Sequence, residues 1–170
     1  MRLFFALWPD ESVRAALADR AAALYALCGG RPTRTENLHL TLAFLGNVDD
    51  RRVAEIEHAA GEVAPRKASL LLDRIGFWKR LAWAGASAVP GEIDGLVLEL
   101  RDALARSRIA FDPKPFVPHV TLLRDARQPR EMPVVAPIAW NLDGFALVRS
   151  PAGRGGAYEV LDSWTLRKRR

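Results

Sequence analysis

The chain has 170 residues, of which 49% are apolar and 26% are charged. This length and balance suit one compact folded domain with its own apolar core, and they exclude a disordered or fibrous chain. The 25 basic residues outnumber the 20 acidic ones, and the net charge of +5 favours a polyanionic partner such as RNA over a cationic one.

The first residues predict a buried strand over 2–8. The apolar run from Leu3 to Trp8 is too short for an export signal or a membrane span, so we expect no membrane association. The single cysteine, Cys28, excludes an internal disulfide framework and indicates a reducing compartment, which predicts a cytoplasmic protein. At the other end, the basic run 167–170 is expected to be a solvated tail.

A helix is predicted over residues 11–27, because apolar residues recur there near helical spacing and two glycines follow. The next segment, 38–44, alternates leucines and a phenylalanine with His39 and Thr41, which predicts a strand. The remaining predicted elements are a helix over 50–63, strands over 69–78 and 81–87, a helix over 93–107, and strands over 119–124, 139–149 and 158–166.

One short pattern occurs twice, as His39-Leu40-Thr41-Leu42 and as His119-Val120-Thr121-Leu122. In each copy the histidine and the threonine share a strand face, about 6.5–7 Å apart along the strand. A single copy is better explained as an ordinary edge strand, but two copies use two of the three histidines in the chain. The repetition therefore predicts two halves of one active site. The third histidine, His58, falls opposite the apolar stripe of its predicted helix, and we assign it no role.

Two imidazoles and two hydroxyls in one cleft suit the opening of a cyclic phosphodiester. A neutral histidine can take a proton from attacking water while a protonated one gives a proton to the leaving ribose oxygen. Thr41 and Thr121 would donate hydrogen bonds to the phosphoryl oxygens as charge builds. The sequence contains no zinc-binding spacing, no Walker-type glycine loop and no dinucleotide-binding glycine pattern, so we expect no metal and no cofactor.

A helix followed by a histidine strand occurs once in each half of the chain. This order predicts an α+β fold built from a duplicated unit, with the two histidine strands brought together about an approximate two-fold axis.

At these residues the chain resembles the 2H phosphoesterase superfamily, and within it the RNA 2′,3′-cyclic phosphodiesterase branch, also described as 2′-5′ RNA ligase. The resemblance extends over nearly the whole chain, and both motifs are intact. It includes the segments Arg2-Leu3-Phe4-Phe5-Ala6-Leu7, Glu36-Asn37-Leu38-His39-Leu40-Thr41-Leu42-Ala43-Phe44-Leu45-Gly46, Pro115-Phe116-Val117-Pro118-His119-Val120-Thr121-Leu122-Leu123-Arg124 and Phe145-Ala146-Leu147-Val148-Arg149-Ser150.

The resemblance implies a single bilobal domain over residues 1–170, with two antiparallel sheets around a central cleft and helices on the outside. It implies a metal-independent hydrolase that opens RNA 2′,3′-cyclic phosphate ends, such as those of tRNA fragments, or cyclic nucleotides, to 2′-phosphates. His39 would be the proton donor and His119 the proton acceptor. We expect a monomer. The same groups could join RNA ends by a reverse 2′-5′ ligation. The alternative is a nucleotide- or RNA-end-binding module without turnover, against which the intact motifs argue.

Two further residues have two interpretations each. The resemblance implies that Arg124 helps to bind phosphate, but strict alternation from His119 would turn its side chain away from the cleft. Phe44 and Phe116 could stack on a base, although strict alternation places Phe44 with the core leucines and favours packing for it.

Overall fold

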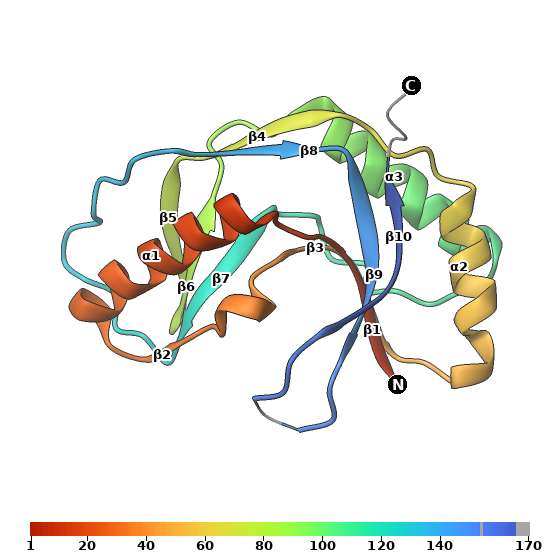
Figure 1. The fold of residues 1–170 in the computed structure, drawn as a ribbon, viewed down its shortest axis with the longest axis horizontal. Coiled ribbons are helices and arrows are strands. Elements are labelled where there is room, and N and C mark those ends of the chain that lie inside the picture. Colours follow the sequence, from red (N-terminus) through yellow and green to blue (C-terminus); the bar gives the residue numbers. More distant parts are fainter. Residues whose placement is uncertain (154, 166–170) are drawn as a thin grey trace.

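The computed structural model describes residues 1–153 and 155–165 and has an α+β architecture (Figure 1). Three α-helices lie against two antiparallel sheets in this part of the chain. The elements are β1 (Arg2–Leu7), α1 (Glu11–Cys28), β2 (Arg31–Pro32), a 3₁₀ turn η1 (Thr35–Asn37), β3 (Leu40–Asn47), a 3₁₀ turn η2 (Asp50–Arg52), α2 (Val53–Gly61), β4 (Ala68–Leu72), β5 (Arg74–Trp78), β6 (Leu81–Gly85), α3 (Gly91–Arg106), β7 (His119–Arg124), β8 (Ile138–Leu142), β9 (Gly144–Ser150) and β10 (Glu159–Thr165).

The larger sheet has eight strands in the order β10-β9-β1-β3-β7-β6-β5, with β2 added beside β7. Its two halves meet where β3 lies next to β7, and these two strands are paired at one position alone, Leu40 opposite Val120. This narrow junction brings the two motif segments together, although they are far apart in the sequence. Beyond the junction the two strands separate.

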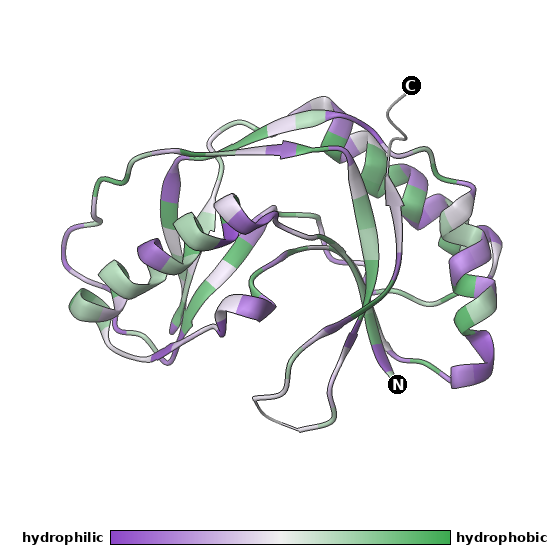
Figure 2. Ribbon diagram, viewed as in Figure 1, coloured by the Kyte–Doolittle hydropathy of each residue, from purple (hydrophilic) through white to green (hydrophobic). Residues whose placement is uncertain are grey.

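Each half of the sheet has its own helical cover. Helix α1 packs on β7 and β8, whereas α3 packs on β3 and also contacts α2 (Figure 1). The carboxylate of Asp10 accepts a 2.9 Å hydrogen bond from the Val13 N–H at the start of α1, and Gly29 closes the helix at a positive φ of 61°. Along α2 and α3, apolar and polar faces alternate (Figure 2), as expected of helices that cover a core.

The smaller sheet consists of β4 and β8. Two long strands that the sequence pattern predicts, 69–78 and 139–149, are each divided between the two sheets. The first divides at Asp73, whose carboxylate accepts the Ser87 N–H at 2.8 Å while its own N–H bonds to the Gly85 carbonyl. The second divides at Asp143, between β8 and β9. Apolar patterning alone does not reveal such a change of sheet, because both segments stay apolar on one face.

The predicted fold class, α+β with two antiparallel sheets, is confirmed, although the sheets are of unequal size. His58 is exposed, as expected. The short elements β2, η1 and η2 were not predicted, and η2 replaces the first turn of the expected helix 50–63. The predicted tail 167–170 lies outside the described residues. None of the helices in the described part of the chain combines the length and apolar character that a membrane crossing requires.

Candidate active site

A cleft of about 670 Å³ lies over the junction of β3 and β7. It brings together all five residues that the sequence analysis proposes for the site. These are His39, Thr41, His119, Thr121 and Arg124. One face of the larger sheet carries the main apolar core, which includes Leu40, Leu42, Leu122 and Leu123. The cleft lies on the opposite face, and strands from both halves of the sheet form its floor.

His39 lies immediately before β3 and is held at both ring nitrogens. Its Nδ1 is 2.7 Å from the Asn37 carbonyl oxygen, and its Nε2 is 3.1 Å from the Thr41 hydroxyl. A carbonyl oxygen can only accept, so Nδ1 carries the proton and Nε2 accepts from Thr41 in the neutral ring. Aromatic rings enclose the imidazole, with ring centroids 4.7 Å away for Phe4 and 5.4 Å away for Tyr158.

His119, the first residue of β7, repeats the same local geometry. Its Nδ1 donates to the Val117 carbonyl oxygen at 2.8 Å, again two residues earlier in the chain, so its Nε2 is also the unprotonated nitrogen of the neutral ring. Trp78 packs edge-on against this imidazole at 4.5 Å, and Trp83 lies 6.4 Å away. Trp83 has room because Gly76 and Gly85 lie beneath its indole, where any Cβ would overlap the ring.

Both imidazoles have a pKa below the ordinary histidine value in the free protein. The pKa of His39 is lowered from 6.5 to about 4, chiefly by burial and in smaller part by the charges of His119 and Arg124, whereas the hydrogen bond to Asn37 opposes the shift. Burial also lowers the pKa of His119, again opposed by the bond to the Val117 carbonyl. At neutral pH both rings are therefore neutral in the free protein.

Arg124 faces the cleft because β7 contains a β-bulge. Along the pairing with β6, Trp83 is opposite Thr121 and Ala82 is opposite Leu123, so Leu122 is an extra residue. Leu122 and Leu123 are both buried in the main core, and the next side chain returns to the side of Thr121. Strict alternation, which predicts that the Arg124 side chain points away from the cleft, is wrong here because the strand is not regular.

The same irregularity occurs in β3. Ala6 is opposite Thr41 and Phe5 is opposite Ala43, which makes Leu42 the extra residue. Leu42 and Ala43 are both buried, and Phe44 returns to the cleft, where the Arg2 guanidinium lies 4.9 Å from its ring centroid. The expectation that Phe44 packs with the core leucines is therefore corrected.

The cleft is lined by basic side chains and, among the described residues, by no carboxylate. Four arginines contribute to its wall: Arg2, Arg31, Arg34 and Arg124. Asp125 pairs with Arg31 at 2.7 Å, and Glu36 pairs with Arg34 at 2.8 Å. Within residues 1–153 and 155–165 no carboxylate lies at ion-pair distance from Arg124. Arg2 has none either, but of the four arginines it is Arg124 whose charge acts on His39, so its guanidinium is well placed to meet a phosphate at the motif histidines.

Sequence reasoning missed Asn37, which ties the glycine-rich loop after β9 to His39. Asn37 is buried, its amide N–H donates to the Gly156 carbonyl at 2.9 Å, and its side-chain oxygen accepts the Tyr158 N–H at 2.9 Å. Its own carbonyl holds the Nδ1 proton of His39. Position is the signal that could have revealed Asn37, because it lies two residues before His39. Val117 lies two residues before His119, and its backbone carbonyl likewise accepts the Nδ1 proton of that histidine.

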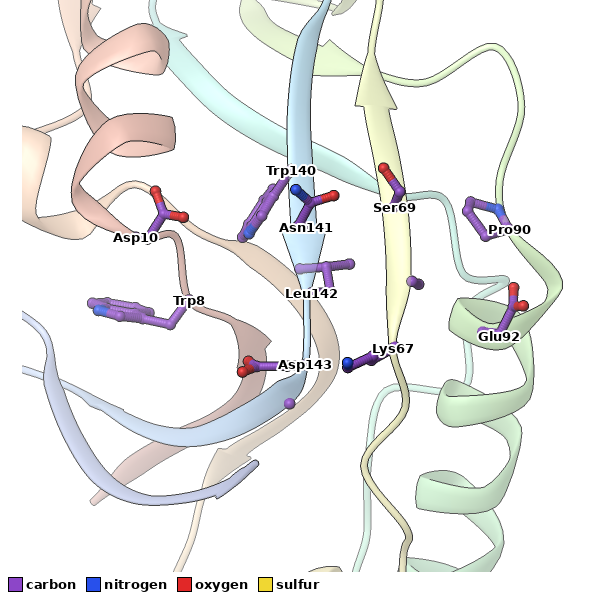
Figure 3. Close-up of a pocket in the computed structure, with 12 residues that line it drawn as sticks. Trp8, Asp10, Lys67, Ser69, Pro90, Glu92, Trp140, Asn141, Leu142 and Asp143 are labelled. Atoms are coloured by element: carbon purple, nitrogen blue, oxygen red, sulfur yellow. The ribbon is translucent and has the colours of Figure 1, made fainter. Parts of the chain in front are cut away.

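A larger hollow of about 890 Å³ lies elsewhere, beside the smaller sheet (Figure 3). Trp8 lines it on one side and Glu92 on the other, and Trp8 also stacks on His39 with ring centroids 5.9 Å apart. Three carboxylates, those of Asp10, Glu92 and Asp143, line this hollow against one ammonium, that of Lys67. Such a lining repels phosphate, so despite its size it is not the candidate active site.

The described residues contain no group of three or more His, Cys, Asp or Glu side chains arranged to hold a metal ion. The side chains that the cleft offers for proton transfer and phosphate binding are two imidazoles, two hydroxyls and the Arg124 guanidinium.

The chain belongs to the LigT-like phosphoesterase family. The family model matches residues 7–83, which include the first motif. The RNA 2′,3′-cyclic phosphodiesterase of Escherichia coli is 35% identical, over 97% of this chain and 96% of that protein. The enzyme of the same name from Thermus thermophilus is 34% identical, over 98% and 91%. A crystal structure of Escherichia coli LigT with 3′-AMP superposes with a TM-score of 0.86 at 34% identity, covering 98% of both chains.

Proposed function

We propose that this protein hydrolyses RNA 2′,3′-cyclic phosphate ends to 2′-phosphate ends. The observation that carries the proposal is the pair of motif histidines, each with its Nδ1 fixed by a backbone carbonyl, in one arginine-lined cleft. Relatives named RNA 2′,3′-cyclic phosphodiesterase support the reaction, and the 3′-AMP complex of a related protein supports the binding of a nucleotide.

In the mechanism we propose, His119 is the proton acceptor and His39 the proton donor. Nε2 of His119 takes a proton from water as the water oxygen attacks phosphorus. The bond from phosphorus to the ribose 3′-oxygen breaks, and His39 Nε2–H protonates that oxygen, which leaves the phosphate on the 2′-oxygen. Because the pKa of His39 is about 4 in the free protein, the anionic phosphate must raise it before His39 can act as the acid.

Thr41, Thr121 and Arg124 would stabilise the phosphoryl oxygens. The Thr41 hydroxyl donates to His39 in the free protein. Protonation of His39 Nε2 removes that acceptor and frees the hydroxyl to donate to the phosphate. Arg124 would supply the compensating positive charge as charge builds in the transition state.

The partners that follow from this chemistry are RNAs with cyclic phosphate ends, including tRNA fragments, and cyclic mononucleotides. We expect a monomer to suffice, since one chain supplies both histidines. The cytoplasm, where thiols such as that of Cys28 stay reduced, is the compartment that we propose. Reverse 2′-5′ ligation is a second candidate activity, because the same two proton transfers run backwards would serve it.

The test is an assay of nucleoside 2′,3′-cyclic phosphates and cyclic-ended oligonucleotides in EDTA, with the product isomer identified by phosphorus NMR. We expect 2′-phosphates and no loss of rate in EDTA. Binding without any product would support the alternative, a binding module without turnover. Strict dependence on added divalent metal would contradict the mechanism.

A further inference from the structure

A small slot opens from the cleft where β3 and the segment before β7 separate. Beyond the single pair Leu40–Val120 the two are not paired again until the Asp112 N–H bonds to the Phe44 carbonyl at 2.8 Å. The space between them has a volume of about 250 Å³. Its lining residues are Thr41, Leu42, Ala43, Phe44, Trp78, Arg101, Asp112, Lys114, Pro115, Phe116, Val117 and His119.

The slot and the cleft meet at the proposed reacting centre. Thr41, Phe44 and His119 line both spaces, whereas His39 and Thr121 line the cleft alone. His119 is therefore the histidine at the boundary, and a group lying in the slot would approach the phosphate from its side.

The slot has the chemical character of a site for one nucleoside. Phe44, Trp78 and Phe116 offer aromatic surface, on which any base can stack. Lys114 and Arg101 lie at its wall, and the Arg101 Nε is buried without a hydrogen-bond partner in the described part of the chain. The volume is below the range of about 300–1,000 Å³ usual for drug-sized ligands, so the slot suits a base rather than a strand.

The RNA chain that ends in the cyclic phosphate needs a different kind of surface from the one that suits a single nucleoside. It brings one negative charge per nucleotide and needs an open, basic surface. The cleft provides four arginines and no carboxylate among the described residues, whereas the slot has two basic side chains, Arg101 and Lys114, beside the Asp112 carboxylate. Since attacking and leaving oxygens lie roughly in line across phosphorus, the attacking group must come from the side opposite the ribose 3′-oxygen.

We propose that the slot is a second nucleoside subsite, which binds the nucleoside whose 5′-hydroxyl replaces water. This inference rests on the function proposed above. The 5′-oxygen bonds to phosphorus and its proton passes to His119 Nε2, while the bond to the 3′-oxygen breaks and that oxygen takes the proton from His39. The product is a 2′-5′ phosphodiester. In the reverse direction the 3′-hydroxyl attacks, the 5′-oxygen leaves with a proton, and a 2′-5′ dinucleotide is cleaved to a cyclic phosphate and a free nucleoside.

The test compares two substrates, adenosine 2′,3′-cyclic phosphate and adenylyl-(2′→5′)-adenosine, for the natural sequence and for Phe116→Ala. Phe116 lines the slot and not the cleft. Loss of one stacking surface should raise KM for the dinucleotide on the order of 10- to 100-fold. Hydrolysis of the cyclic mononucleotide should change by less than about twofold, because water needs no such surface.

Phe77→Ala is the matched control, since Phe77 is a partly buried phenylalanine that lines neither space. It should leave the ratio of the two activities unchanged. Phe116→Leu keeps the apolar packing and removes the aromatic ring, so it covers the case in which Phe116→Ala does not fold. Phe116→Trp should restore dinucleotide cleavage.

Equal losses on both substrates would overturn the proposal, because the slot would then hold the base of the cyclic nucleotide itself. Absence of any dinucleotide cleavage or 2′-5′ joining by the natural sequence would overturn it too. Neither result touches the proposed hydrolysis, which fails only if the cyclic mononucleotide itself is not opened.

Discussion

Phe44 and Arg124 occupy equivalent positions in the two motif strands, each five residues after a motif histidine, and both line the cleft. In each strand one extra residue, Leu42 in β3 and Leu122 in β7, interrupts the alternation and lets two consecutive apolar side chains enter the core. The bulges thereby add a third cleft-facing side chain to each motif. One half of the cleft receives an aromatic ring at this position, and the other a cation.

Removing either motif histidine should lower turnover of adenosine 2′,3′-cyclic phosphate by about 10²–10⁴-fold, because each is assigned one proton transfer. Steady-state rates for His39→Ala and His119→Ala measure this. His58→Ala is the control, since His58 is exposed and lies outside the cleft. Full activity in either motif variant would refute the assignment.

Arg124→Ala should lower kcat/KM by about 10- to 100-fold, the effect of losing one charged hydrogen bond worth about 1.5–3 kcal/mol. Arg124→Lys should recover part of the loss, because it restores the charge without the planar fork of the guanidinium. Arg127, which does not line the cleft, provides the matched Arg127→Ala control. An unchanged kcat/KM in Arg124→Ala would remove Arg124 from the site.

The pH profile of kcat/KM should be bell-shaped, with its optimum on the acid side of 6.5. That profile reports the free protein, in which the pKa values of His39 and His119 both lie below 6.5. The profile of kcat should be displaced to higher pH, because the bound phosphate favours the imidazolium. Initial rates over pH 4–9 separate the two. A kcat/KM optimum above pH 7 would contradict the burial of the imidazoles.

Acid should destabilise the protein through His39. Its unfolded pKa of 6.5 exceeds its folded pKa of about 4, so the unfolded chain binds the proton more readily between these values. The stability is complete above pH 6.5 and is lost as the pH falls toward 4, by about 3 kcal/mol in all. Urea unfolding of the natural sequence and His39→Gln at pH 7 and pH 4 isolates this contribution. His58→Gln should show the same acid loss as the natural sequence.

Gly76→Ala should destabilise the fold by about 1–3 kcal/mol, because the added Cβ overlaps the Trp83 ring and overpacks it. Turnover should fall as well, since Trp83 packs beside His119. Gly91→Ala at the start of α3 has no heavy atom within 4 Å of the new Cβ and should be neutral or slightly stabilising. Thermal unfolding of the two variants makes the comparison, and equal melting temperatures would contradict the packing argument.

Local pattern was sufficient for most elements. The apolar spacing of 11–27 and the alternation around His39 predicted α1 and the start of β3 to within a few residues, because periodicity reports which face is buried. It failed for 69–78 and 139–149, where each segment changes sheet in mid-course. A change of sheet depends on which strands lie alongside, and no local residue pattern encodes it.

The residue pattern was enough to predict the α+β class, the family, and the placing of each motif histidine on the same side of the chain as its threonine. Two-residue alternation depends on backbone geometry alone. The folded chain was needed to show that Arg124 and Phe44 face the cleft, that Asn37 anchors His39, and that a slot adjoins His119. These depend on bulges, on long-range hydrogen bonds and on the separation of β3 from β7, each of which arises from pairing between distant segments.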